Sequence, residues 1–451
     1  MRKRISAFFS VLAAIVLLTV PASAASSGST LKIICADAGQ VIFTPPGSTQ
    51  YAYRYGPAIL IDGDRIDIWA SAPPLVSNGV RYGNDSIEYI RSTDGGKTWT
   101  GWKTVLYPTL NSEDQWSTCD PGAFKYGDYY YVGYTGSPEF RTNPDKEKQV
   151  NNLFIARAKN PEGPYEKWNG NGWGGDPYAI TRYSGDGVGC SMPSFTVKGD
   201  TLYMYYVDQT HPDQDWNSEG NISVSTFSLK DPNWPGNELS NKMCENKPEE
   251  VRYCPDIDKF IGFQLKGGWD YDSYVEIYES TDGVNFTKTS SFRNNFPHYA
   301  HNIGISGNNL GQLDLSIQNY IGTAYTPTGV EAWWGHWHTQ LIPLYIREEQ
   351  PSPTTSSQPS GSTDSSSQKP TISSVGSTDG ESSETEVSEP QNSNIESTVS
   401  DDKDKDKEVN NKTEQQEETS YLWLYIVIGA VVVLAGAGTA VYFLVIKKKH
   451  V

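Results

Sequence analysis

Short runs that alternate apolar and polar residues dominate the chain between about residues 27 and 349. Runs such as DRIDIWASAP, DYYYVGYTG, DTLYMYYVD and NYIGTAYTP are bounded by Gly, Asp and Asn, and no segment keeps the period of an amphipathic helix. Alternation of this kind between turn residues is typical of β-strands. The pattern therefore predicts an all-β domain.

One sequence frame recurs along this domain. A residue followed by proline precedes an apolar run, a Gly/Asp turn and an aromatic strand, as in RYGPAILIDGDRIDIWAS, TCDPGAFKYGDYYYVGYT, CSMPSFTVKGDTLYMYYVD and RYCPDIDKFIGFQL. The prolines lie 64, 72 and 62 residues apart, and they are Pro57, Pro121, Pro193 and Pro255. A fifth unit starts at His301-Asn302. Repeats of this length, each with about four short strands, are typical of propeller blades.

Five such units predict a five-bladed β-propeller over residues 27–349. Each residue-Pro pair is expected to open an innermost strand beside the central channel. A β-sandwich with a second domain is the alternative, and it leaves the recurrence unexplained. The N-terminal run STLKIICAD is expected to pair with WHTQLIPLYI in the last blade, because a ring closed in this way leaves no unpaired sheet edge.

Two terminal segments predict where this domain is located. Residues 1–24 combine a basic start, an apolar stretch and the small residues Ala22-Ser23-Ala24, which is typical of a secretory signal peptide. Residues 422–446 are 25 uncharged residues, enough to span ~30 Å of hydrocarbon, and lysines follow in the tail at 447–451. The positive-inside rule then predicts a single-pass cell-membrane protein with an extracellular N-terminal domain and a short cytoplasmic C-terminus.

A stalk rich in Ser, Thr, Pro, Glu and Asp is predicted at residues 350–420. It has no hydrophobic period and cannot bury enough apolar surface to offset the entropy of ordering, so we expect it to be disordered. Its 15 acidic residues against 5 lysines supply more than half of the formal net charge of −18. The acidity thus belongs largely to the stalk. Because the chain also lacks basic clusters, we do not expect it to bind nucleic acid.

The propeller sequence resembles the five-bladed propeller glycoside hydrolases of family 43 and their relatives. The segments DPGAFKYGDYYYVGYT, ARAKNPEGPYEKW and AHNIGISGNNLGQ carry this resemblance, which covers nearly all of residues 27–349. It implies an oligo- or polysaccharide substrate, no required cofactor, and carboxylates at the starts of the innermost strands of blades one to three. These act as general base, as pKa-adjusting Asp and as general acid. Asp120 stands at the blade-two position, whereas Gly56 and Met192 occupy the other two.

Three aspartates are candidates for the catalytic carboxylates. Cleavage of a glycosidic bond needs an acid at the leaving oxygen and a second carboxylate, ~5–5.5 Å away in retaining and ~6.5–9.5 Å away in inverting enzymes. Asp120 is the first candidate, with a turn aspartate that bonds a backbone amide as the alternative. Asp256 is a candidate for the second carboxylate, against a solvated or calcium-binding residue. Asp186, on a loop that leads to the channel, is the third.

Four residues are predicted to bind substrate. Trp116 and Trp269 occupy loops and are candidates for stacking on sugar faces. Asp85 lies on a loop that leads to the channel. Arg54, in YRYGPA, resembles the arginine of the first sialidase blade, which binds a substrate carboxylate; an ion pair in the channel or between blades is the alternative.

Two further motifs concern sialidases and metal ions. RSTDGGKTW (Arg91–Trp99) matches the sialidase Asp box, Ser-x-Asp-x-Gly-x-x-Trp, and ESTDGVNF (Glu279–Phe286) is a degenerate copy. The box is a hairpin turn in which the Asp and Ser side chains bond turn amides, so it predicts structure rather than sialic acid chemistry. The resemblance implies that His301 helps to hold Ca²⁺ at the propeller axis; a hydrogen-bonded channel histidine is the alternative.

These observations leave two classes of function. The first is a cell-surface glycoside hydrolase that uses carboxylate general acid–base chemistry on extracellular glycans. The second is a catalytically inactive carbohydrate-binding protein on the same scaffold, which Gly56 and Met192 favour. A sialidase-like exoglycosidase is a further alternative within the first class.

Limited proteolysis is expected to release a stable fragment that ends near residue 349. A closed ring of blades protects its own backbone, whereas a polar stalk does not. Mass spectrometry of the time course identifies the fragment. Progressive digestion from the stalk into the repeats would contradict a single closed domain.

Overall fold

The computed structural model describes residues 29–46, 52–138, 140–143, 146–182, 188–210, 220–327 and 336–349. Contacts divide the chain into two units, Met1–Gln358 and Pro359–Val451, and all described residues belong to the first. The predicted signal peptide, stalk, membrane segment and tail lie outside the described residues. Within the described ranges every regular element is a β-strand, and no helix is long and apolar enough to cross a membrane.

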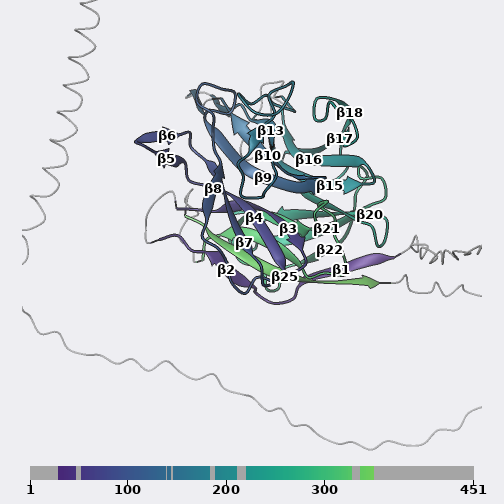
Figure 1. Cartoon of the computed structure of the whole chain (residues 1–451). Coiled ribbons are helices and arrows are strands. Elements are labelled where there is room, and N and C mark those ends of the chain that lie inside the picture. Colours follow the sequence, from purple (N-terminus) through teal and green to yellow (C-terminus); the bar gives the residue numbers. More distant parts are fainter. Residues whose placement is uncertain are drawn as a thin grey trace, which may run out of the picture. The chain divides into compact units, whose positions relative to one another are not determined.

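Twenty of the described strands form five four-stranded antiparallel blades (Figure 1). Blades two, three and four are separate sheets, whereas blades five and one join in one sheet through β23 and β3. Blade one comprises β3 (Tyr55–Asp62), β4 (Arg65–Ala72), β7 (Ser86–Ser92) and β8 (Lys103–Leu106). Blade two comprises β9 (Ser117–Tyr126), β10 (Tyr129–Ser137), β13 (Asn152–Ala158) and β14 (Glu166–Lys167). Blade three comprises β15 (Gly189–Lys198), β16 (Thr201–Gln209), β17 (Asn221–Ser228) and β18 (Glu238–Met243).

Blade four comprises β19 (Glu250–Cys254), β20 (Lys259–Lys266), β21 (Tyr274–Ser280) and β22 (Thr287–Phe292). Blade five comprises β23 (Ala300–Gly307), β24 (Asn319–Tyr325), β25 (His338–Glu349) and β1 (Thr30–Cys35). The strand β2 (Gln40–Phe43) pairs with β25. Two short hairpins complete the set: β5 (Leu75–Ser77) with β6 (Val80–Tyr82), and β11 (Phe140–Asn143) with β12 (Lys146–Gln149).

The first strands of the five blades form a closed ring. β3 contacts β9, β9 contacts β15, β15 contacts β19, and β19 contacts β23. β23 returns to β3, with which it pairs in parallel at Ser306 and Ile59. The predicted five-bladed propeller is confirmed by this ring, and a sandwich is excluded.

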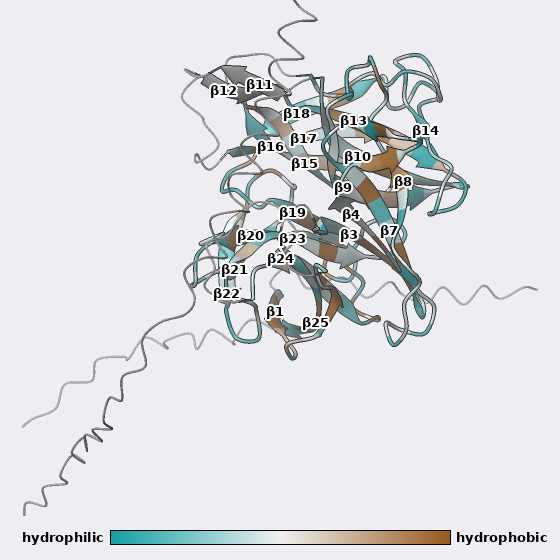
Figure 2. Ribbon diagram, turned by 90° about the vertical axis from the view of Figure 1, so that its left-hand side faces the viewer, coloured by the Kyte–Doolittle hydropathy of each residue, from teal (hydrophilic) through white to brown (hydrophobic). Residues whose placement is uncertain are grey.

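Apolar side chains fill each of the five junctions between neighbouring blades. Trp69 and Phe154 belong to the cluster between blades one and two, and Ile277 and Ile305 to the one between blades four and five. Three further clusters occupy the remaining junctions. Figure 2 shows the hydrophobic segments along the strands, with hydrophilic residues mostly in the connecting turns. Each sheet is therefore buried on both faces, and the hydrophobic effect stabilises the ring at every junction.

The N-terminal strand completes the last blade. β1 pairs antiparallel with β25 from Thr30 opposite Glu349 to Cys35 opposite Leu344, and the purple and green strands lie together in Figure 1. This prediction is confirmed. All five cysteines are buried and none forms a disulfide.

The residue before the proline has the same conformation in blades one to three. At these positions φ is 58°, 48° and 57°, in the left-handed region. The backbone N–H donates to a side chain of the preceding blade in each case. These bonds run from Gly56 to Asn302 Oδ1 (2.9 Å), from Asp120 to Ser71 Oγ (2.7 Å) and from Met192 to Thr135 Oγ1 (2.9 Å). Each bond satisfies a backbone amide of the ring and fixes a blade start to its neighbour.

In blade four the proline that precedes the innermost strand is not the one that the repeated sequence frame predicts. β19 ends at Cys254, and Pro255 follows in the turn to β20. The proline that precedes this innermost strand is Pro248. The prediction that Pro255 opens an innermost strand is therefore wrong. The apolar Ile257 after it suggested a strand, but Ile257 belongs to the turn and packs from there into the core between blades four and five.

The loop of residues 308–314, after β23, closes one end of the channel. It bonds to four blades: Lys125 N–H to Asn309 O (2.5 Å), Val197 N–H to Leu310 O (3.0 Å), Leu313 N–H to Tyr253 O (2.9 Å), and Asn309 Nδ2 to Asp62 Oδ2 (3.2 Å). All four partners lie near the ends of innermost strands. We call this end the plugged end, and the end where the innermost strands begin the mouth end.

Gly304 in β23 marks a very close approach of two channel strands. A Cβ at this position would stand 1.6 Å from the carbonyl oxygen of Pro57 in β3. Gly304→Ala is therefore expected to push blades five and one apart and to lower the free energy of unfolding by about 3 kcal/mol.

Gly101 supplies the matched control, because an added Cβ there would meet nothing within 4 Å. Gly101→Ala should change the free energy of unfolding by less than about 0.5 kcal/mol. Urea unfolding followed by tryptophan fluorescence compares the two variants. Equal stabilities would contradict the packing described for Gly304.

Candidate functional site

Polar and aromatic side chains from several blades meet at the mouth end of the channel. Ring contacts, hydrogen bonds and charge interactions link these side chains to one another. We call the group the mouth cluster: Tyr53, Tyr55, Asp85, Cys119, Asp120, Trp269, His301 and Trp337. Their positions in sequence span almost the whole propeller. The closed ring brings them together.

Asp120 presents a carboxylate in this cluster. Its left-handed backbone conformation, at φ 48°, is one that aspartate tolerates better than most residues. The Cys119 thiol donates to Oδ2 over 3.4 Å. Oδ1 faces Gly56, where a Cβ would lie 3.5 Å from it. The residue as a whole is half-buried.

Burial raises the pKa of Asp120 to about 6. The negative charge of Asp85 adds to the rise, while hydrogen bonds from Cys119 and Thr135 oppose it. A carboxyl group with a pKa close to neutrality can give up or accept a proton at physiological pH. Asp120 therefore has the electrostatic character of a proton-transfer residue.

Asp85 is fully engaged inside the protein. Only 3% of the residue is exposed, and its carboxylate accepts hydrogen bonds from the hydroxyl of Tyr53, from Ser117 Oγ (3.0 Å) and from Asn84 Nδ2 (3.3 Å). Burial also raises the pKa of Asp85. Asp85 thus makes internal hydrogen bonds, and substrate binding by Asp85 stays a prediction.

Three aromatic rings surround the imidazole of His301. The ring centroids of Trp337, Trp269 and Tyr55 lie 4.2, 4.4 and 5.5 Å from that of His301. Trp269 has a left-handed backbone (φ 72°) and is 38% exposed, so its indole is accessible at the mouth end. An exposed indole is a suitable surface for a sugar ring.

Calcium binding by His301 stays a prediction. Ca²⁺ takes six to eight oxygen ligands, whereas this imidazole lies among rings. Burial lowers the pKa of His301 to about 3, so the imidazole is neutral at physiological pH. Among the residues that the structure describes, no group of three or more His, Cys, Asp or Glu could hold a metal ion.

The two other catalytic candidates do not join Asp120 in the described structure. Asp256 lies exposed in the β19–β20 turn, at the plugged end, where Oδ2 accepts the Leu315 N–H at 3.1 Å. Asp186 lies outside the described residues. A second carboxylate opposite Asp120 therefore stays a prediction.

The remaining predicted substrate-binding residues hold internal contacts. The guanidinium of Arg54 pairs with Glu88 at 2.5 Å, donates to the Tyr53 carbonyl at 2.6 Å and lies 4.6 Å from the ring centroid of Phe43. This is an ion pair within blade one. Trp116 is half-buried, and its carbonyl accepts the Asn84 N–H at 2.6 Å.

Both Asp boxes form the predicted turns. Asp94 accepts the N–H groups of Lys97 (3.0 Å) and Thr98 (2.9 Å). Asp282 accepts those of Val284 (2.9 Å) and Asn285 (2.8 Å). Their carboxylates are used by the turns themselves.

A buried ion pair in blade four was missed by the sequence analysis. Glu250 Oε2 pairs with Arg252 Nη2 at 2.8 Å and accepts from Ser194 Oγ at 3.2 Å, while Arg252 Nε donates to the Ile305 carbonyl at 3.1 Å. The pair links the innermost strands of blades three, four and five. Placing the frame at Pro248 would have located Glu250 at the start of β19. Trp337 was also missed as a member of the mouth cluster.

Comparison with known proteins gives structural matches only. No family model matches the chain, and no curated protein matches it. The α-L-arabinofuranosidase PaAbf62A from Podospora anserina, solved with cellotriose, is 11% identical, with a TM-score of 0.45 over 71% of this chain and 98% of the other. A family 117 glycoside hydrolase from Zobellia galactanivorans is 15% identical, with a TM-score of 0.45 over 71% and 90%.

A GH43 protein from Bacillus licheniformis, BlXynB, is 12% identical, with a TM-score of 0.43 over 67% of this chain and 54% of its own. Glycoside hydrolases of families 43, 62 and 117 are among the matched structures. A likeness at this level carries no conclusion on activity. The architecture rests on the closed ring of blades, and function has to be argued from the mouth cluster.

Asp120→Asn is expected to stabilise the protein at alkaline pH. Because the folded-state pKa, about 6, is raised above the unfolded value, protonation favours the native state, and this contribution is lost as the pH rises through 6. Asparagine does not ionise, so a variant with asparagine at position 120 does not lose this stability as the pH rises. The gain in the free energy of unfolding should be about 1 kcal/mol larger at pH 8 than at pH 5.

Thermal unfolding at both pH values tests this expectation. Asp64→Asn, in the exposed β3–β4 turn, is the control and should show no such difference. A stabilising effect of Asp120→Asn that grows toward pH 5 would contradict the raised pKa.

Proposed function

We propose that the propeller is a glycoside hydrolase that acts on extracellular glycans, with Asp120 as a proton-transfer residue at the mouth end of the channel. One observation carries the proposal: Asp120, a half-buried residue with a pKa of about 6, lies at the mouth end in the cluster that Tyr55 and His301 link to the exposed Trp269. A glycosidic bond held at the indole would find a proton donor and acceptor in one place. The extracellular location is supported by residues 1–24 and 422–446 of the sequence.

Among the described residues, neither of the other predicted catalytic aspartates supplies a second carboxylate beside Asp120. Asp186 is the candidate on this chain, since it lies a few residues before β15, whose first half belongs to the mouth end. Gly56 cannot supply it, and Met192 carries an apolar side chain at the equivalent place in blade three.

A carbohydrate-binding protein without catalytic activity is the second candidate. The observation that favours it is the occupation of two of the three equivalent blade starts by Gly56 and Met192. Trp269 and Asp120 would then bind sugar by stacking and hydrogen bonding alone. Turnover separates the two candidates.

Asp120→Asn is expected to lower kcat/KM by about 10²–10⁴, because proton transfer in the transition state is lost. The purified protein is assayed with aryl arabinoside, xyloside, galactoside and sialoside, and binding is measured on a glycan array. The wild-type pH profile should contain one limb with an apparent pKa near 6 that is absent from any residual activity of the variant.

Asp64→Asn serves as the control and should retain full turnover. Turnover that survives Asp120→Asn unchanged would refute the proposed role of Asp120. Glycan binding without turnover of any of the four substrates would favour the second candidate instead.

A further inference from the structure

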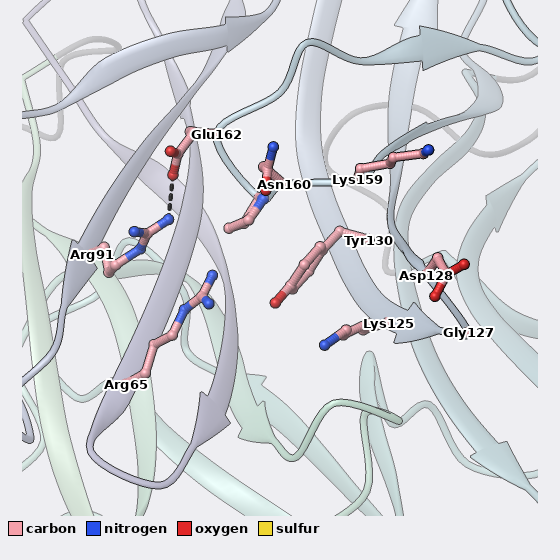
Figure 3. A pocket seen from close by; sticks show the side chains of 10 residues that line it. Arg65, Arg91, Lys125, Gly127, Asp128, Tyr130, Lys159, Asn160 and Glu162 are labelled. Carbon is pink, nitrogen blue, oxygen red and sulfur yellow. Dashed lines mark hydrogen bonds and ion pairs between the residues drawn. The ribbon is translucent and has the colours of Figure 1, made fainter.

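A polar pocket of about 350 Å³ lies between blades one and two, on the side of the hairpin turns that also carries the plugged end of the channel (Figure 3). Strands β4, β7, β9 and β10 and the turn after β13 build it. Four basic side chains line it, Arg65, Arg91, Lys125 and Lys159, against the two acidic side chains of Asp128 and Glu162. Its chemistry is therefore cationic, unlike the acidic chain as a whole.

Two internal carboxylates neutralise only part of this charge. Arg91 pairs with Glu162 and lies 3.3 Å from the buried Asp67. Arg65 Nε lies 2.8 Å from the same Asp67. The remaining Arg65 Nη2 is buried and makes no hydrogen bond to any described residue. Lys125 has no carboxylate partner among the described residues, so one positive charge on this wall of the pocket is not balanced.

Tyr130 adds a third donor to the same space. The residue is only 5% exposed, and its hydroxyl has no hydrogen-bond partner within the described ranges. Figure 3 shows the Tyr130 hydroxyl, the Arg65 guanidinium and the Lys125 ammonium pointing toward one another, whereas the ammonium of Lys159 points away. The Lys125 ammonium lies 5.1 Å and the Arg65 guanidinium 5.6 Å from the centroid of the Tyr130 ring. Because the Tyr130 hydroxyl lines the pocket and makes no hydrogen bond to a described residue, it can donate to an acceptor held there.

We propose that this pocket binds the oxyanion of an acidic sugar, either a sulfate ester or a carboxylate. Three donors that converge from two blades, two of them cationic, match an acceptor with several oxygens and a negative charge. The volume admits one monosaccharide ring in addition to the anionic group. The site is separate from the mouth cluster and does not depend on the function proposed for Asp120.

Isothermal titration of the purified protein with glucose 6-sulfate, glucuronate, inorganic sulfate and glucose tests the proposal. The two acidic sugars should bind, glucose should not, and affinity should fall as salt is added. Lys125→Gln should weaken binding by about tenfold and Tyr130→Phe by about fivefold, since a charge-assisted and a neutral hydrogen bond are lost.

Lys159→Gln removes the same charge from the same rim and is the matched control; it should change affinity less than twofold. Equal weakening by Lys159→Gln and Lys125→Gln would overturn the proposal in favour of diffuse surface charge. Affinities that neither Lys125→Gln nor Tyr130→Phe changes, or no binding of either acidic sugar, would overturn it as well. Equal affinity for inorganic sulfate and glucose 6-sulfate would refute the sugar part. Asp120→Asn should leave all these affinities unchanged, which separates this site from the proposed hydrolase site.

Discussion

At a blade start, the backbone N–H of the residue before the proline needs a hydrogen-bond acceptor inside the ring. This requirement determines how the chain is arranged at the mouth end. In blades one to three the amide turns sideways, in a left-handed conformation, and donates to the preceding blade. A buried amide without a partner would cost about 1–3 kcal/mol at each position. Because the amide is fixed to the neighbouring blade, the orientation of the side chain at that residue is fixed too, and in blade two this residue is Asp120.

The same geometry explains why the three equivalent positions cannot be treated alike. A Cβ at Gly56 would stand 3.5 Å from the Asp120 carboxylate, so a carboxylate there would repel it and raise a pKa further. With glycine at that place, burial governs the pKa of Asp120, and the engaged Asp85 adds a smaller effect. The chain thus retains a single titratable group at these three starts, with a pKa already close to neutrality.

Local sequence patterns predicted the fold well, because strands, turns and blade repeats each depend on residues that are close together in the sequence. The predicted start of the innermost strand of blade four was wrong, because the apolar Ile257 suggested a strand but lies in a turn. The site was predicted only in part. Asp120 and Trp269 follow from the repeat and the loops, but the stacking of His301 on Trp337 and the Glu250–Arg252 pair depend on ring closure, which no local pattern contains.

The loop of residues 308–314 makes the two ends of the channel different, because it closes the plugged end and leaves the mouth end open. Residues 308–314 bond to the ends of innermost strands in four blades and close the channel there, so the mouth cluster is open to one side only. The cationic pocket lies on the hairpin side, between blades one and two, and shares no side chain with the mouth cluster. Groups without shared partners act almost additively in a packed protein. A rigid ring can therefore hold a titratable carboxyl on one side and a cationic pocket on the other, and no side chain of the pocket is among the causes that raise the pKa of Asp120.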